Sequence, residues 1–146
     1  NSRPHLGTAY EKVAADVIES QRPQMGGKPI EIELLADGSV TVNAPASVVS
    51  VALTNLIGNA IKYTMEGKVT VRVLDGRIDV IDTGPGIKPE DAEKLFQRGI
   101  RGESATGGGA GLGLAIVRRL CELYGWDVSL RPRPEMSGAI STIDFR

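Results

Sequence analysis

Two asparagines, a lysine and a tyrosine recur at helical spacing between Asn55 and Thr64. Asn59 follows Asn55 by four residues. Lys62 and Tyr63 follow Asn59 by three and four residues, so all four side chains share one helix face. Apolar residues recur at three- and four-residue steps on the remaining surface: Val49, Leu53, Leu56, Ala60 and Ile61. A polar line above a core-facing stripe predicts a polar ligand lying along the helix.

Asp82 is a second candidate site residue, at the end of an alternating apolar stretch. In a strand, Ile78, Val80 and Asp82 point to the same face, and that face is apolar. The carboxylate therefore faces the core, where it needs hydrogen bonds to offset its desolvation. An adenine amino group is one natural donor, and the turn at Thr83-Gly84 is the alternative. The residues alone leave both interpretations open.

Glycines mark two further segments that suit a nucleotide. In the stretch Thr83-Gly84-Pro85-Gly86-Ile87, two glycines let the backbone approach a flat ligand, although Gly-Pro-Gly is also an ordinary turn. From Gly107 to Val117, glycines open an apolar helix, and the free N–H groups at such a helix start suit phosphate. The second segment matches neither a P-loop nor a dinucleotide-binding fingerprint, and a flexible linker is its alternative reading.

Composition excludes several function classes. The 146 residues fit one domain, 1–146, and 17 basic residues nearly balance 18 acidic ones, which argues against bulk electrostatic binding of nucleic acid. The sequence has no run of 18 apolar residues, so we expect no segment of it to span a bilayer. One cysteine and one histidine exclude a disulfide within the chain and a zinc-type cluster, and Cys121 is predicted to be a small buried hydrophobe. The chain does not begin with Met, so we interpret it as a fragment of a longer protein.

The hydrophobic periodicity predicts helices segregated from strands. The helices are expected at Thr8–Arg22, about Ala46–Thr64, and Leu112–Tyr124 with Gly125 as its stop. The strands are expected at Ile30–Leu34, Val40–Val42, Val69–Val73, Ile78–Asp82, Val128–Leu130 and Ile140–Phe145. Asp37-Gly38 and Asp75-Gly76 predict hairpin turns, and Asn43 or Ser47 is a candidate cap for the second helix. This pattern predicts an α+β fold with one sheet and one helical layer.

The segment between Thr83 and Ala110 lacks a long periodic element and shows only a short helical candidate around Pro89 to Gln97. Seven glycines fall in the fifteen positions from Gly99 to Gly113. A long Gly-rich stretch inside a compact domain is typical of a functional lid or a disordered segment. We expect a lid over residues 88–110 and a disordered tail over residues 1–7.

Four segments together resemble the ATP-binding catalytic domain of sensor histidine kinases, which share a superfamily with gyrase, Hsp90 and MutL. Asn55 to Thr64 resembles the N box, and Asp82 to Ile87 the G1 box. Leu95 to Arg98 resembles the F box, and Gly109 to Val117 the G2 box. The match covers roughly Ile30 to Phe145. It implies a Bergerat-type fold, a two-layer α/β sandwich whose mixed sheet is covered on one face by about three helices.

The resemblance implies that the matching residues bind ATP with Mg²⁺. Asn59 would supply an oxygen to Mg²⁺, Lys62 would neutralise phosphate charge, and Asp82 would accept a hydrogen bond from the adenine amino group. The remaining implied ATP contacts are Tyr63, Gly84, Gly86, Ile87, Gly109, Gly111, Leu112, Gly113 and, near Asp82, Thr142.

The lid contributes two further implied residues. Arg98 and Arg101 could reach the γ-phosphate as transfer begins, and Asn55, Lys62 and Arg98 are the implied catalytic residues. Many family members have two aromatic residues after the F-box arginine. Gly99-Ile100 stands there in this chain, which indicates a looser lid.

The sequence lacks the phosphoacceptor histidine that the family carries in a preceding helical domain. His5 is the single histidine and lacks the His-Glu-x-x-x-Pro-like surroundings of an acceptor. The chain is therefore expected to bind ATP without phosphorylating itself. It would donate the γ-phosphoryl group to a histidine on a separate dimerisation and phosphoacceptor domain, with a response regulator as an indirect partner. The resemblance also implies a monomeric fragment from the cytoplasmic part of a membrane-anchored sensor kinase.

Asn55 bears on which superfamily member this is. In gyrase and MutL a glutamate general base lies one helical turn before the Mg²⁺-binding asparagine. Asn55 occupies that place here, and an amide cannot accept a proton near neutral pH. The position favours phosphoryl transfer over hydrolysis. A non-catalytic nucleotide-sensing module and, less favoured, a gyrase- or MutL-type ATPase remain as alternatives.

Overall fold

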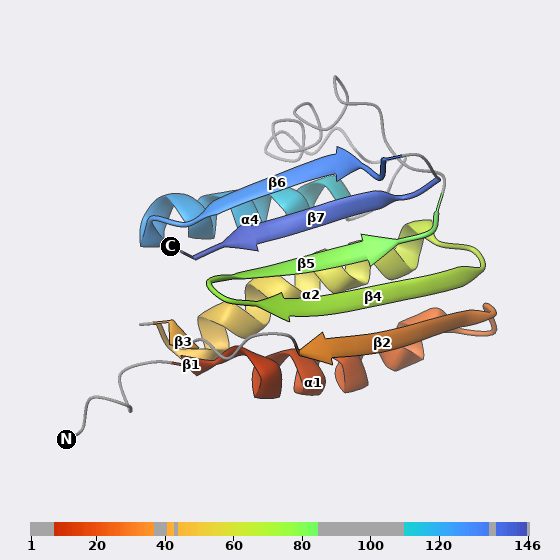
Figure 1. Ribbon diagram of the computed structural model, residues 1–146, viewed down its shortest axis with the longest axis horizontal. Coiled ribbons are helices and arrows are strands. Elements are labelled where there is room, and N and C mark those ends of the chain that lie inside the picture. Colours follow the sequence, from red (N-terminus) through yellow and green to blue (C-terminus); the bar gives the residue numbers. More distant parts are fainter. Residues whose placement is uncertain (1–7, 37–40, 43, 85–109, 135–136, 146) are drawn as a thin grey trace.

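A computed structural model of the chain describes residues 8–36, 41–42, 44–84, 110–134 and 137–145. In these ranges, three α-helices lie against one face of a five-stranded sheet, as Figure 1 shows. The helices are α1 (Tyr10–Gln21), α2 (Ala46–Tyr63) and α4 (Ala110–Tyr124), and η2 (Arg22–Met25) is a 3-10 turn. The strands are β1 (Thr8–Ala9), β2 (Ile30–Ala36), β3 (Thr41–Val42), β4 (Gly67–Leu74), β5 (Arg77–Asp82), β6 (Asp127–Pro132) and β7 (Ala139–Asp144). The predicted α+β sandwich with a mixed sheet is confirmed.

The main sheet has the strand order β2-β4-β5-β7-β6, which places β5 at its centre. The β4–β5, β5–β7 and β6–β7 pairs are antiparallel, and the predicted β4–β5 hairpin is confirmed. Gly76 takes the left-handed conformation in its turn, at φ 79°.

The predicted hairpin between β2 and β3 is wrong. Strand β2 instead pairs in parallel with β4, with Ile30 opposite Gly67, while β3 pairs with β1. A parallel pair needs a crossover, and α2 supplies it between β2 and β4. The alternation in β2 correctly identified a strand, but it carries no information about which strand is its partner.

The core lies between the helices and the inner face of the sheet. Helix α2 contributes its predicted apolar stripe, in which Leu53, Leu56 and Ile61 are each at most 1% exposed. Ile57, which was not part of the predicted stripe, is fully buried as well. The sheet contributes fully buried aliphatic residues at alternate strand positions: Val69, Val71, Val73, Ile78, Val80 and Ile143. Burial of these facing stripes fixes α2 along the central strands.

The two ends of α2 are held differently. At its start, Pro45 is the N-cap, and no described side chain caps the helix. The prediction of Ser47 as the cap is therefore wrong, and Asn43 lies outside the described residues. At its end, Lys28 donates from Nζ to the Ile61 and Lys62 carbonyl oxygens at 2.9 and 3.2 Å. A cation at this position satisfies terminal carbonyls and complements the helix dipole.

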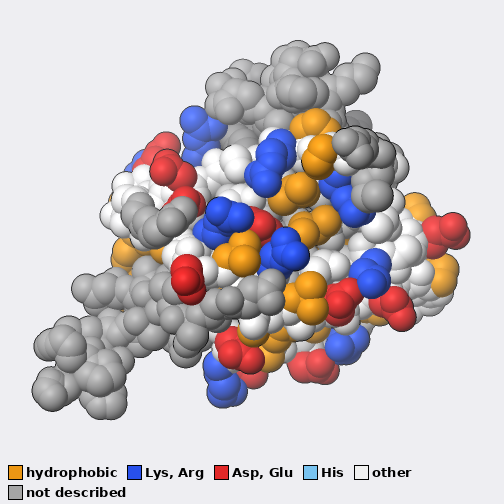
Figure 2. All heavy atoms as spheres, in the orientation of Figure 1, with side chains coloured by type: hydrophobic (Ala, Val, Ile, Leu, Met, Phe, Trp, Pro, Cys, Tyr) orange, Lys and Arg blue, Asp and Glu red, His pale blue; other side chains and the backbone are white. Residues whose placement is uncertain are grey.

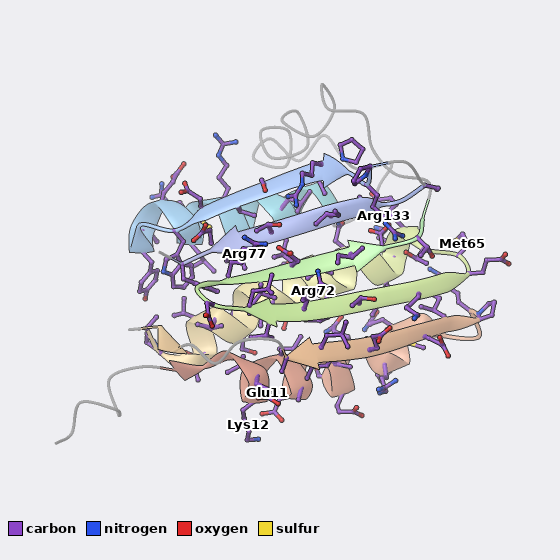
Figure 3. The ribbon with its side chains drawn as sticks, in the orientation of Figure 1. Glu11, Lys12, Met65, Arg72, Arg77 and Arg133 are labelled. Carbon is purple, nitrogen blue, oxygen red and sulfur yellow. The ribbon has the colours of Figure 1, made fainter. Side chains whose placement is uncertain are left out.

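The outer face of the sheet carries no helix in the described part of the chain (Figure 1). Figure 2 shows this face as a mixture of hydrophobic side chains with Lys, Arg and acidic groups, and Figure 3 shows Arg72 and Arg77 on it. Among the described residues, no helix is long and apolar enough to cross a membrane.

Candidate functional site

The predicted polar line of α2 divides into buried and exposed parts. The side-chain oxygen Oδ1 of Asn59 is buried and has no hydrogen-bond partner among the described residues. Asn55 donates from Nδ2 to the Val51 carbonyl oxygen one turn earlier, at 2.8 Å. Lys62 and Tyr63 are exposed, Tyr63 by 40%. A buried side-chain oxygen without a hydrogen-bond partner is rare in proteins. Asn59 is therefore the residue of the polar line whose oxygen is available to a ligand.

Asp82 is buried at the end of β5, on the face that looks toward the helices. Its Oδ1 accepts hydrogen bonds from the backbone N–H groups of Gly84 and Ala139, at 2.9 and 3.2 Å. Both of these hydrogen bonds go to the same oxygen of the carboxylate. Burial raises the pKa of Asp82, and the two N–H donors and the nearby Arg133 guanidinium oppose that rise. One oxygen of Asp82 thus bonds the turn at Gly84, as the first interpretation expected, and the other oxygen leaves room for the second interpretation, a ligand donor.

The turn between β6 and β7 holds the chain around Asp82. Arg133 donates from Nη1 to the Asp82 carbonyl oxygen at 3.3 Å, and Ser137 donates from Oγ to the Gly84 carbonyl oxygen. Gly138 has a φ of 126° and leaves no room for a Cβ against the Asp82 carbonyl. Figure 3 shows Arg133 at the end of the sheet where β5 terminates. Sequence reasoning missed these residues, because they lie more than 50 positions from Asp82 and form no motif with it.

Two predicted motif glycines mark close contacts between elements. A Cβ on Gly84 would lie 2.7 Å from the Tyr63 carbonyl oxygen and 3.3 Å from Asp82 Oδ1. A Cβ on Gly113 would lie 2.8 Å from Asn55 Oδ1. Gly84 thus lets the end of β5 approach the end of α2, and Gly113 lets the first turn of α4 approach Asn55.

The prediction that Thr142 lies near Asp82 is wrong. Thr142 donates from Oγ1 to Asp79 Oδ1 at 2.7 Å and accepts from Arg131 at 3.2 Å, on the outer face of the sheet. Strand alternation explains the difference, because Thr142 pairs with Asp79 while Ala139 pairs with Asp82. Ser141 is the β7 hydroxyl on the inner face, where it is 7% exposed. The same alternation, read from the sequence, could have found it.

Several predicted site residues lie outside the described part of the chain: Gly86, Ile87, Arg98, Arg101 and Gly109. The same is true of the expected tail over residues 1–7 and of nearly all of the expected lid over residues 88–110. Gly111 and Leu112 lie in the first turn of α4, which begins at Ala110. The start of this helix is therefore close to its predicted position at Leu112.

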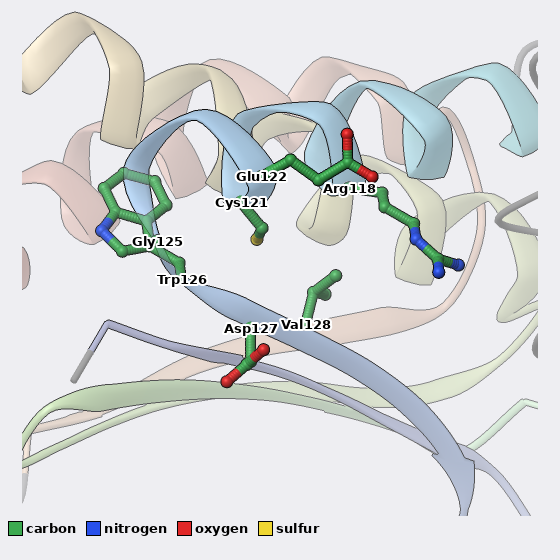
Figure 4. Close-up of a pocket in the computed structure, with 7 residues that line it drawn as sticks. All are labelled: Arg118, Cys121, Glu122, Gly125, Trp126, Asp127 and Val128. Carbon is green, nitrogen blue, oxygen red and sulfur yellow. The ribbon is translucent and has the colours of Figure 1, made fainter.

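A separate depression of about 470 Å³ lies at the other end of α4, against β6 (Figure 4). It is lined by Arg118, Cys121, Glu122, Gly125, Trp126, Asp127 and Val128. Burial, together with the nearby Asp127 and Glu122 carboxylates, raises the pKa of Cys121 to about 12. The thiol is protonated at neutral pH and 4% exposed, which confirms Cys121 as a buried small hydrophobe. No group of three or more potential metal ligands occurs among the described residues.

The mixed sheet with its helical layer defines a two-layer α/β sandwich. The family described as histidine kinase-, DNA gyrase B- and HSP90-like ATPases matches residues 46–146, so the chain belongs to this ATP-binding family. Its relatives and structural neighbours are sensor histidine kinases, and the chain corresponds to their ATP-binding catalytic domain.

Two curated relatives illustrate the similarity. The virulence sensor protein BvgS of Bordetella bronchiseptica is 42% identical over 106 residues, which cover 64% of this chain and 8% of BvgS. The sensor-like histidine kinase SenX3 of Mycobacterium tuberculosis is 30% identical over 132 residues, which cover 85% of this chain and 32% of SenX3. The chain therefore spans at most about a third of these relatives.

Solved structures agree with this assignment. The crystal structure of full-length ShkA in complex with AMPPNP superposes with a TM-score of 0.78 at 31% identity, covering 94% of this chain and 30% of ShkA. The mycobacterial sensor histidine kinase MprB gives a TM-score of 0.74 at 27% identity, covering 94% of this chain and 93% of that one.

Proposed function

We propose that this domain binds ATP with Mg²⁺ and donates the γ-phosphoryl group to a histidine on a separate dimerisation and phosphoacceptor domain. The observation that carries the proposal is a pair of open acceptors, Asn59 Oδ1 on α2 and Asp82 Oδ2 at the end of β5. Asn59 Oδ1 is buried without a partner among the described residues, and both hydrogen bonds described for the Asp82 carboxylate go to its other oxygen, Oδ1. The two groups fit opposite ends of a nucleotide. The AMPPNP held by the related ShkA supports a nucleotide as the ligand, because AMPPNP is an ATP analogue.

Asn59 fits a magnesium ligand. A buried carbonyl oxygen without a partner costs about 1–3 kcal/mol, which a ligand can return. Mg²⁺ prefers oxygen ligands and is commonly held by one or two protein groups together with phosphates and waters. Bound there, Mg²⁺ would neutralise the charge that develops on the phosphates during transfer.

Asp82 fits the adenine end. Its Oδ1 is fixed by two backbone donors, so Oδ2 has a defined direction and can accept from the exocyclic amino group. The absence of a Cβ at Gly84 keeps the neighbouring backbone close, and the base can then approach the carboxylate.

The first turn of α4 fits the phosphates. The N–H groups of Gly111, Leu112 and Gly113 lie at the positive end of a 15-residue helix, which favours a negatively charged group. Lys62 is exposed at the end of α2, where its ammonium can approach the same phosphates. The proposal also includes the lid arginines Arg98 and Arg101, which lie outside the described residues.

Asn55 favours phosphoryl transfer over hydrolysis. Its amide donates to the Val51 carbonyl, and an amide cannot take a proton from water near neutral pH. A neutral imidazole needs no such base, because its nitrogen lone pair attacks the γ-phosphorus directly. The new N–P bond forms as the bond to the β–γ bridging oxygen breaks, and ADP leaves. The names of the related kinases support this direction, and we place the domain in the cytoplasmic part of a membrane-anchored sensor kinase.

Calorimetric titration with Mg-ATP, followed by transfer of labelled γ-phosphate to a supplied acceptor domain, tests the proposal. We expect binding that weakens when EDTA removes Mg²⁺, and a label on histidine that is stable to base and lost in acid. Binding without transfer to any acceptor would favour the nucleotide-sensing alternative. Steady ADP release without an acceptor would favour a gyrase- or MutL-type ATPase.

A further inference from the structure

Thr64 combines complete burial with an unsatisfied hydroxyl. The residue is 0% exposed, and its Oγ1 has no hydrogen-bond partner among the described residues. Its backbone N–H is satisfied by the Ala60 and Ile61 carbonyl oxygens at 3.1 and 3.4 Å, as the C-cap of α2. A hydroxyl without a partner in the interior is unfavourable, so packing alone does not account for a threonine at this position.

The hydroxyl lies beside the proposed nucleobase site. Thr64 Oγ1 and Asp82 Oδ1 are 3.4 and 3.3 Å from the point that a Cβ on Gly84 would occupy. The two side chains come from the C-cap of α2 and the end of β5, and both lie close to one glycine. A carboxylate that accepts and a hydroxyl that can donate therefore lie around the same point at Gly84.

We propose that the Thr64 hydroxyl is a second nucleobase contact, which donates to adenine N1 directly or through one water while Asp82 accepts from the N6 amino group. This inference rests on the proposed function and deepens it. The Watson–Crick edge of adenine presents a donor, N6–H, beside an acceptor, N1. Guanine presents the reverse pattern, O6 beside N1–H, and its O6 would face the Asp82 carboxylate. The pair of Asp82 and Thr64 thus selects adenine over guanine.

The alternative is that Thr64 only fills space below Gly84. Valine has nearly the same shape as threonine, and replacing an unsatisfied buried hydroxyl by a methyl group leaves stability unchanged or raises it. Stability alone therefore cannot separate the two explanations. The two explanations are distinguished by combining a substitution of Thr64 with a change at adenine N1. Only a direct or water-mediated contact makes the effects of the two changes on affinity non-additive.

The test is calorimetry of the purified protein with Mg-ATP and with two analogues. In 1-deaza-ATP a C–H group replaces N1, and in the control 7-deaza-ATP a C–H group replaces N7. We expect 1-deaza-ATP to bind the native protein about tenfold more weakly than ATP, and Thr64→Val to bind ATP about tenfold more weakly. Thr64→Val should bind 1-deaza-ATP no more weakly than ATP, whereas 7-deaza-ATP should affect both proteins equally. Thr64→Ser, which keeps the hydroxyl, should behave as the native protein.

Two results would overturn the inference. One is equal affinity of the native protein for ATP and 1-deaza-ATP, which needs no variant and stands even if Thr64→Val does not fold. The other is the same loss with 1-deaza-ATP in Thr64→Val as in the native protein. A native protein that binds no Mg-ATP would instead refute the proposed function, so the two failures are distinguishable.

Discussion

The carboxylate of Asp82 carries a conflict between folding and binding. Burial raises its pKa, which means that the folded domain favours the protonated form while ligand binding needs the charged one. Two backbone N–H groups on Oδ1 return part of the desolvation cost. The raised pKa shows that these bonds do not offset the whole desolvation cost. At the scale of the residue, the charged Asp82 side chain thus lowers the stability of the domain in the absence of a ligand.

Replacing Asp82 with Asn should therefore raise stability and lower affinity. The folded pKa of Asp82 lies above the unfolded value of about 3.9, so in the native protein this group lowers the unfolding free energy as pH rises through that window. The stability gain of Asp82→Asn should be absent below about pH 4 and reach its full size above the raised pKa. ATP should bind about 1.5–3 kcal/mol more weakly, because a charge-assisted acceptor is lost. Urea unfolding at several pH values and calorimetry measure the two effects.

Asp79→Asn is the matched control. Asp79 is 5% exposed on the same strand but faces the opposite side of the sheet, beside Thr142 and Arg77. This change should lower stability and leave ATP affinity unaltered. If Asp82→Asn also lost stability while binding ATP normally, Asp82 would have a purely structural role.

At the scale of elements, α2 uses its two asparagines in different directions. Asn59 presents an open oxygen, whereas Asn55 is bonded along its own helix and touches α4 at Gly113. The contact links the helix that carries the proposed metal ligand to the helix start that would bind phosphates. The space that Gly113 leaves open therefore sets how closely the two can approach.

Gly113→Ala should lower stability by roughly 1–3 kcal/mol and weaken ATP binding, because the new methyl group overpacks against Asn55 and displaces the start of α4. Asn55 cannot rotate away without losing its bond to Val51. In the Asn55→Ala background the same glycine change should cost little affinity. It should even raise stability by up to about 1 kcal/mol through helix propensity. A double-mutant cycle on ATP affinity measures the coupling, and strictly additive effects would show that the contact does not matter for binding.

Local patterns were enough to predict much of this arrangement. The 3.6-residue period located α2 and α4, and alternation located β4, β5 and the inward direction of Asp82. These features depend on which residues recur within one element. Gly113 was predicted as part of a glycine run, although its contact with Asn55 could not be.

Features that depend on which elements meet could not be predicted. The parallel partner of β2, the Lys28 cap of α2 and the grip of Arg133 and Ser137 on the end of β5 all join positions far apart in sequence. A strand pattern specifies a face but not a neighbour, and a lone lysine or arginine has no local signal. The prediction for Thr142 was wrong for a narrower reason. Alternate residues of β7 face opposite sides of the sheet, so Ser141 faces inward and Thr142 outward.

At the scale of the whole molecule, the folded unit extends beyond the segment that the family description matches. That segment begins at residue 46, yet α1 buries Val13, Ala14, Val17 and Ile18 in the common core. Lys28 also reaches from before β2 to the end of α2. Helix α1 and Lys28 thus support the helix on which the proposed site is built.

Removing residues 1–29 should abolish cooperative unfolding. Burial of Val13, Val17 and Ile18 contributes roughly 1.5–3 kcal/mol each, which together approaches the whole stability of a typical domain. The milder Ile18→Ala should keep a cooperative transition and lower its free energy by about 2–4 kcal/mol. Trp126 is the single tryptophan and 6% exposed, so its fluorescence in urea follows both variants. A sharp transition in the shortened chain would show that α1 and Lys28 are dispensable.

The central place of β5 has one more consequence. Hydrogen bonds to β4 on one side and β7 on the other hold its backbone, so its amide protons should be among the last in the sheet to exchange with solvent. Asp82 ends that strand, and its direction is therefore set before any nucleotide arrives. Little conformational entropy remains to be lost at the adenine end on binding, so the affinity gained there is not reduced by ordering of the protein backbone.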